Sequence, residues 1–285
     1  MAYSNARPRM AVAAVAGLDV RKDFAEVVIE AAERFGLHHL ADEAREATKG
    51  KGSYTPRARP LPRVELPPVL EHEERTYPPI ESVEALLAQC GDVADDDEAR
   101  TMLEGRALNP YLVDDYRLAR VLPKGATLPP WASFWTRTGH RLIVPVYDAQ
   151  GIVRSVRAWR VVDGDSPKRL PPGNTKLNLH YKAGGLVMAD ECGRAILTGH
   201  QTGAMPIVIC EGEPDWMTWA LALSDANETP WATFGVLSGA WTQEIADRIP
   251  SGSEVNLWTD QDKKGDDYAR AVASTLAKRC KVVRR

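Results

Sequence analysis

Carboxylates directly follow two apolar runs in the C-terminal third of the chain. The run at 206–210 leads into Glu211 and Asp215, and the run at 255–259 leads into Asp260 and Asp262. Each run has the length of a buried strand, and the carboxyl ends of parallel strands border the crevice where ligands bind. Carboxylates gathered there repel one another unless a cation lies between them, and hard oxygen ligands suit Mg²⁺ or Mn²⁺. These residues therefore predict a divalent-metal site.

The two acidic motifs resemble the TOPRIM domain, which primases, topoisomerases and some nucleases share. Their patterns are Glu-Gly-x-x-Asp at 211–215 and Asp-x-Asp-x-x-Gly at 260–265. Each motif follows an expected strand and precedes an expected helix, in the order of that family. The alternative is a pair of ordinary strand-to-helix turns with acidic helix caps.

The resemblance implies a role for each motif residue. Catalysis would fall to Glu211, Asp260 and Asp262, and the same three would hold Mg²⁺ or Mn²⁺ with Asp215 as an outer ligand. An acidic charge at a helix start is the other interpretation of Asp215. Two glycines, Gly212 and Gly265, would let the backbone approach metal or phosphate closely.

The segment upstream resembles the N-terminal half of the catalytic core of bacterial-type DNA primase. Residues 102–108, 140–151 and 174–178 resemble, in order, a helical element, an arginine-led hairpin and a loop before the TOPRIM strand. The resemblance covers about 95–285. The zinc-binding domain of that family has no counterpart here, because residues 1–80 hold no cysteine. We therefore expect template recognition by such a domain to be absent or supplied by a partner.

Charge is unevenly placed in a chain whose net charge is −3. Residues 137–182 hold nine basic and three acidic side chains, whereas residues 207–267 hold twelve acidic and three basic ones. One segment could bind phosphates while the other holds metal. Our candidates for template or triphosphate contact are Arg141, Arg157 and Lys176, and solvated strand faces are the alternative. Base-stacking candidates in the basic segment are Trp131 and Trp135.

The four cysteines form no metal-ligand or disulfide pattern, since none lies close to another in the sequence. This spacing indicates a reducing, cytoplasmic location. No apolar run is long enough to span a membrane.

The pattern of apolar residues and turn formers predicts four regions. These are a helical N-terminal segment at 1–53, a linker at 54–79, a basic α+β subdomain at 80–200, and a TOPRIM-type, mostly parallel α/β sheet at 201–285. Seven prolines between 56 and 79 favour an extended linker. Predicted elements include a hairpin at 142–147 and 152–162, strands at 206–210, 231–237, 254–259 and 281–283, and helices at 214–224, 241–248 and 266–279.

Together these features predict an enzyme of the α/β class: a primase-like nucleotidyltransferase that makes short RNA primers on single-stranded DNA. Its expected partners are the template, ribonucleoside triphosphates and a replicative helicase. A TOPRIM nuclease or phosphodiesterase would use the same carboxylates to activate water. A non-catalytic DNA-binding replisome module is the third hypothesis. Such a module would be expected to have lost the acidic residues of the two motifs, but Glu211, Asp260 and Asp262 are all present.

Overall fold

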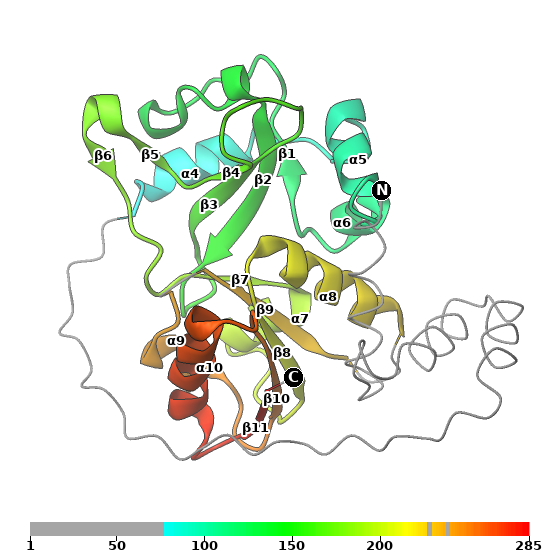
Figure 1. Ribbon diagram of the computed structural model, residues 1–285, viewed down its shortest axis with the longest axis vertical. Helices are drawn as coiled ribbons and strands as arrows, with labels where there is room; N and C mark the ends of the chain where they lie inside the picture. The colour runs from blue at the N-terminus through cyan, green and yellow to red at the C-terminus, as the bar shows by residue number, and fades with distance from the viewer. Residues whose placement is uncertain (1–76, 227–229, 238–239, 285) are drawn as a thin grey trace, which may run out of the picture.

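The computed structural model describes residues 77–226, 230–237 and 240–284. The predicted N-terminal segment and nearly all of the predicted linker lie outside these residues. The described part is a mixed α/β structure built on a nine-stranded sheet, with strand order β11-β10-β8-β9-β7-β2-β3-β4 and β1 paired to β2 (Figure 1). This confirms the predicted fold class.

The strands of this sheet are β1 (Arg120–Val121), β2 (His140–Tyr147), β3 (Val153–Arg160), β4 (Arg169–Leu170), β7 (Val187–Ala189), β8 (Pro206–Glu211), β9 (Ala232–Val236), β10 (Glu254–Trp258) and β11 (Lys281–Arg284). A separate hairpin pairs β5 (Gly173–Asn174) with β6 (Leu179–His180). The α-helices are α4 (Ile80–Leu87), α5 (Asp97–Glu104), α6 (Pro110–Asp115), α7 (Glu191–Leu197), α8 (Glu213–Ala226), α9 (Gln243–Arg248) and α10 (Lys263–Leu276). Short 3₁₀ turns are η1 (Pro130–Ala132), η2 (Thr136–Thr138) and η3 (Thr175–Leu177).

The sheet has a parallel half and an antiparallel half. Strands β11, β10, β8 and β9 run parallel to one another. Strands β7, β2, β3 and β4 pair antiparallel, and β7 joins the halves by pairing with β9 on one side and β2 on the other. The predicted division near residue 200 therefore separates elements of one continuous sheet.

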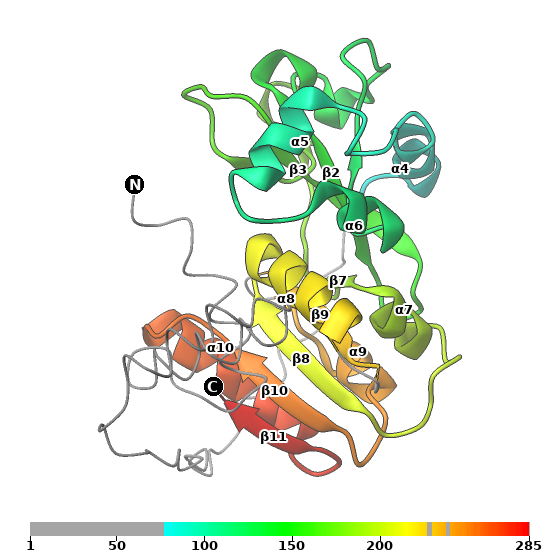
Figure 2. The ribbon, with the colours of Figure 1, turned by 90° about the vertical axis from the view of Figure 1, so that its right-hand side faces the viewer.

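Side chains of β8 alternate between the two faces of the parallel half. Val208 and Cys210 pack with Trp216 and its neighbours on α8, whereas Ile207 and Ile209 pack with residues of α7, α9 and α10. Figure 2 shows α8 on one side of these strands and α9 and α10 on the other. Both faces are covered, which explains why the strands are almost continuously apolar.

Helix caps fix where several helices begin. Asp96, Asn109, Asp190 and Asp262 each accept a hydrogen bond from a backbone N–H in the first turn of the helix that follows. Such caps satisfy N–H groups that have no partner inside the helix. The last helix starts at Lys263 rather than at the predicted residue 266, because Asp262 is its cap.

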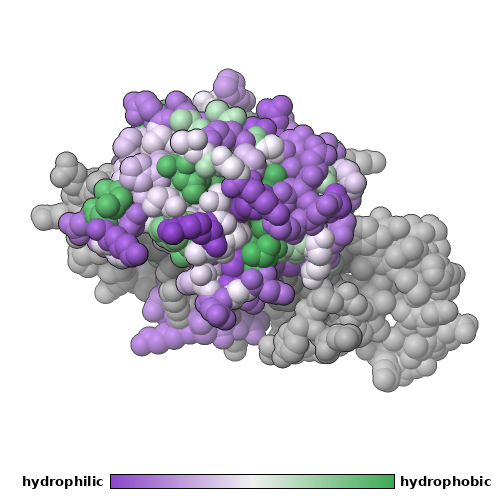
Figure 3. Space-filling model, turned by 90° about the horizontal axis from the view of Figure 1, so that it is seen from above, coloured by the Kyte–Doolittle hydropathy of each residue, from purple (hydrophilic) through white to green (hydrophobic). Residues whose placement is uncertain are grey.

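The surface seen from above the antiparallel half is mostly hydrophilic, with small separate apolar patches (Figure 3). The exposed large hydrophobic side chains of the described residues are Tyr111, Ile152, Val162 and Leu177. Within the described ranges, none of the helices has the length and hydropathy that crossing a bilayer would require.

Candidate active site

The carboxyl ends of β8 and β10 lie side by side. These strands are adjacent and parallel, with Trp258 opposite Cys210, so Glu211 and the loop beginning at Thr259 leave the same edge of the sheet. From β8 the chain passes through α8 to β9 on one side, and from β9 through α9 to β10 on the other. The crevice between β8 and β10 is thus a topological switch point, the place where open α/β sheets bind ligands.

A left-handed glycine turns the chain from β8 into α8. Gly212 has a φ of 81°, a conformation that side chains with a Cβ rarely adopt, and its N–H donates to the carbonyl of Val236 at 3.0 Å. The turn leaves Glu211 and Asp215 half-buried at the crevice. Glu211 is the last residue of β8, and Asp215 lies in the first turn of α8.

The second acidic motif forms a tight connection between β10 and α10. Asp260 and Asp262 are both exposed, and one oxygen of Asp262 accepts from the N–H of Gly265 at 2.7 Å. A Cβ on Gly265 would lie 2.0 Å from the carbonyl oxygen of Asp260. The glycine is required for this backbone contact, so nothing here indicates the predicted approach of Gly265 to metal or phosphate.

The side-chain types at the crevice suit Mg²⁺ or Mn²⁺, since carboxylate oxygens are the ligands these ions prefer. Within residues 77–226, 230–237 and 240–284, however, no three acidic, histidine or cysteine side chains lie close enough together to hold a metal ion. The predicted ligand set of Glu211, Asp215, Asp260 and Asp262 has suitable chemistry but does not converge in this arrangement.

Arg141 is not available to a template strand, and this prediction was wrong. Its side chain is 3% exposed, and its guanidinium donates to both oxygens of Asp96 at 2.7 and 2.8 Å, to Glu98 at 2.7 Å and to the carbonyl of Leu122 at 2.8 Å. Burial favours the neutral form of the guanidinium, but these bonds to carboxylates outweigh it and raise the pKa of Arg141. The arginine fastens the start of α5 to β2.

Arg157 lies at the crevice, in a network that sequence reasoning missed. Its Nε donates to Glu213 at 2.8 Å, and Arg169 donates through Nη1 to the other oxygen of Glu213, also at 2.8 Å. The Glu213 side chain is 2% exposed. Burial alone would raise the pKa of Glu213, but the charges and hydrogen bonds of the two arginines outweigh it, so the pKa is below its usual range. Glu213 stands inside the first acidic motif, which was the available signal.

The remaining candidates of the basic segment lie apart from this network. Lys176 is exposed on η3, between β5 and β6. Trp131 and Trp135 are 2% and 0% exposed and contact each other edge to face, with ring centroids 5.4 Å apart. Buried rings cannot stack on bases, so that hypothesis was wrong.

A buried tyrosine faces the first acidic motif from α10. Tyr268 is 8% exposed, and within the described structure its hydroxyl has no hydrogen-bond partner. Burial, followed by the nearby carboxylate of Glu211, raises the pKa of Tyr268. Sequence periodicity gives no hint of this placement, because an aromatic residue on a helix is usually core.

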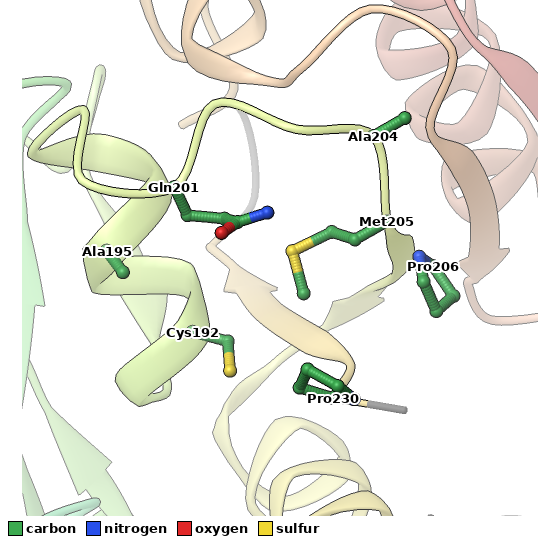
Figure 4. A pocket seen from close by; sticks show the side chains of 7 residues that line it. All are labelled: Cys192, Ala195, Gln201, Ala204, Met205, Pro206 and Pro230. Carbon is green, nitrogen blue, oxygen red and sulfur yellow. The ribbon is translucent and has the colours of Figure 1, made fainter. Parts of the chain in front are cut away.

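A small apolar pocket lies at the opposite end of β8 (Figure 4). Its volume is about 250 Å³, and its lining includes Cys192, Gln201, Met205 and Pro206. Pro206 begins the strand that ends at Glu211, so the pocket and the carboxylates are separated by the length of β8. The pocket is not part of the candidate site.

Comparisons with known proteins give matches among solved structures. No protein-family model matches this chain, and no curated protein matches it. The structure of the DnaG catalytic core is 17% identical, with a TM-score of 0.46, and the match covers 69% of this chain and 66% of that one. A DnaG primase catalytic domain bound to single-stranded DNA is 16% identical, with a TM-score of 0.45, over 69% of this chain and 65% of that one.

A third match is the RNA polymerase domain of Mycobacterium tuberculosis primase DnaG, 19% identical, with a TM-score of 0.44, over 72% of this chain and 74% of that domain. This chain thus spans slightly less than two thirds of the two DnaG structures above. The three structures reported above are all catalytic or RNA polymerase domains of DnaG primases.

Proposed function

We propose that this protein is a primase-like nucleotidyltransferase that synthesises short RNA primers on single-stranded DNA. The observation that carries the proposal is the placement of Glu211 and of Asp260 and Asp262 after adjacent parallel strands at a topological switch point. The TOPRIM resemblance of the same two motifs supports it. In this proposal residues 201–285 act as the TOPRIM domain.

The acidic residues would hold the divalent metal. Glu211, Asp260 and Asp262 are the proposed ligands of Mg²⁺ or Mn²⁺, with Asp215 as an outer ligand. The ion would neutralise charge on the phosphates of the incoming ribonucleotide. In this proposal Glu211, half-buried at the end of β8, would also accept a proton from the attacking 3′-hydroxyl, directly or through water.

The N-terminal half would provide the basic wall of the site. Strands β3 and β4 carry Arg157 and Arg169 to the first acidic motif. A nucleic acid or triphosphate beside the carboxylates needs cationic side chains of this kind. The single-stranded template and ribonucleoside triphosphates are the proposed partners, and a replicative helicase is a proposed partner without a defined surface here.

The test is a synthesis assay with the purified full chain. Single-stranded DNA, four ribonucleotides with one labelled, and Mg²⁺ or Mn²⁺ should yield short, template-dependent RNA. Asp260→Asn should abolish the product, whereas Arg248→Ala should not, since Arg248 is exposed at the end of α9, far from the carboxylate edge. Degradation of the DNA without RNA synthesis would replace the proposal with a nuclease. DNA binding with neither product would replace it with a non-catalytic replisome module.

A further inference from the structure

The Glu213 network leaves one positive charge in excess beside the candidate active site. One buried carboxylate neutralises only one of two guanidinium groups. The side chains of Arg157 and Arg169 remain 20% and 39% exposed, whereas Glu213 is 2% exposed. The excess charge is therefore on the solvent side of the network and not in the core.

Arg169 is held in one orientation on the turn that follows Glu211. Its Nη1 lies 3.8 Å from the position a Cβ on Gly212 would take. Its guanidinium carbon lies 5.9 Å from the ring centroid of Trp159, in a cation–π contact. The carboxylate on one side and the indole on another fix the plane of the guanidinium, so little side-chain entropy remains to be lost when a ligand binds.

The loop that leads to Arg169 is also fastened. The carbonyl of Pro167 can only accept a hydrogen bond, so Nε2 of His140 donates to it, at 2.7 Å. Nδ1 of the same ring then accepts from the hydroxyl of Thr138 at 2.8 Å. Arg160 donates to the carbonyl of Ser166 in the same loop. A loop restrained at two successive carbonyls presents Arg169 at a defined place.

Most donors of the two arginines are still available. A guanidinium has five N–H donors. Within the described structure Arg169 and Arg157 each donate one side-chain hydrogen bond, and both go to Glu213. Guanidinium forks bind the oxygens of phosphate with two parallel hydrogen bonds, which gives geometric specificity as well as energy.

We propose that Arg169, with Arg157 beside it, binds a phosphate group at the Gly212 turn, and that Glu213 is the positioning residue that orients both arginines. The inference rests on the proposed function for the source of the phosphate, which is either the triphosphate of a ribonucleotide or the backbone of the single-stranded template. The bound chemistry is the same in both cases.

The experiment measures binding of two probes to the full chain. ATP with Mg²⁺ is titrated by calorimetry, and a fluorescein-labelled oligo(dT) is titrated by anisotropy over a range of salt. Arg169→Ala should weaken one of the two probes by about tenfold, and Arg248→Ala, which removes a surface arginine at the other end of the sheet, should weaken neither. Thermal unfolding of each variant checks that the fold is kept.

The two sources of phosphate give different results. If Arg169 contacts the template, oligo(dT) binding should lose about 0.7 from the slope of log affinity against log salt, with ATP unaffected. If it contacts the triphosphate, ATP affinity should fall while AMP affinity stays the same. Unchanged affinity for both probes in a folded Arg169→Ala variant would overturn the inference.

A double-variant cycle tests the role of Glu213. If Glu213 positions Arg169, the loss caused by Arg169→Ala should be much smaller in a Glu213→Gln background, because the arginine is already misplaced there. A purely structural Glu213 would lower the melting temperature and leave that loss unchanged, which would overturn the positioning role. Primer synthesis is a separate readout. Wild-type protein that binds a probe through Arg169 but makes no RNA would sink the proposed function and leave the phosphate site standing.

Discussion

Two ion networks in this protein have opposite charge order. In the antiparallel half, buried Arg141 is the centre, with Asp96 and Glu98 around it at 2.7 Å. At the junction with the parallel half, buried Glu213 is the centre, with Arg157 and Arg169 around it at 2.8 Å. Each centre is almost fully buried, and the outer groups are partly exposed in both networks.

The difference lies in the net charge that each network presents to solvent. Arg141 uses its donors on two carboxylates and a backbone carbonyl, and Lys124 pairs with the outer carboxylate of Glu98, so this network is closed and carries no excess charge. Glu213 can satisfy only part of two guanidinium groups, so its network presents positive charge beside Glu211. A buried arginine in a basic segment therefore need not be available to phosphate, whereas a buried carboxylate can orient the arginines that we propose to bind it.

Removing the centre of the first network should have the largest effect on stability. Arg141→Ala leaves Asp96 without its arginine and Glu98 with Lys124 alone, and it should lower the free energy of unfolding by about 3–5 kcal/mol. Urea denaturation of the variant and wild type measures this difference. Affinity for oligo(dT) per folded molecule should not change, and a selective loss of DNA binding in a stable variant would contradict the structural role.

Asp190 shows what happens to a buried carboxylate without an arginine partner. It accepts from the N–H groups of Gly193 and Thr233, yet burial raises its pKa to about 6 from a usual value of 3.8. Because the folded protein holds this proton more tightly, the contribution of Asp190 to stability is full below pH 3.8 and is lost as pH rises to about 6.

The free energy of unfolding should lose about 3 kcal/mol of the Asp190 contribution over this pH range, at about 1.4 kcal/mol for each unit of pKa shift. The measurement is the free energy of unfolding of wild type minus that of Asp190→Asn between pH 3.5 and 7. The lowered pKa of Glu213 has the opposite sign, because its contribution is lost as pH falls through its folded pKa. A difference between wild type and Asp190→Asn that does not change with pH would rule out the raised pKa.

Neutralising Glu213, the centre of the second network, should lower the free energy of unfolding by an intermediate amount. Glu213→Gln keeps the shape and removes the charge, so the two arginines lose charge-assisted bonds, at a cost of about 2 kcal/mol. Chemical denaturation at pH 7 measures it. A cost equal to that of Arg141→Ala would mean that the two networks are equally structural, and the comparison between them would fail.

Substitutions of Asp262 should have the smallest effect on stability and a large effect on primer synthesis. Its oxygen caps α10, so Asp262→Ala should cost about 1 kcal/mol, while Asp262→Asn, which retains a good cap, should cost little. Both should reduce primer synthesis at least a hundredfold, because both remove the proposed metal ligand. Asp260→Ala is the matched control that loses the charge without a helix cap. Full activity in Asp262→Asn would exclude Asp262 as a ligand.

Much of the parallel half could be predicted from sequence. The strand predicted at 206–210 is Pro206–Glu211, and the helix predicted at 214–224 is Glu213–Ala226. Strands buried on both faces read as continuous apolar runs, so their limits are visible in the sequence. Once the strand limits are known and the strands are taken to be parallel, Glu211 and Asp260 must follow the carboxyl ends of their strands. The start of α10 was misplaced by three residues because a cap, and not the apolar pattern, determines it.

The sequence by itself determined which carboxylates leave the strands and that a basic segment precedes them. Only the tertiary structure decided which arginine serves which role. Arg141 and Arg157 look alike in sequence, but Arg141 pairs with Asp96, 45 residues before it, and Arg157 with Glu213, 56 residues after it. Ion pairs at such separations depend on which strands become neighbours and on how far each side chain is buried. That information resides in the packing of the sheet and not in local residue spacing.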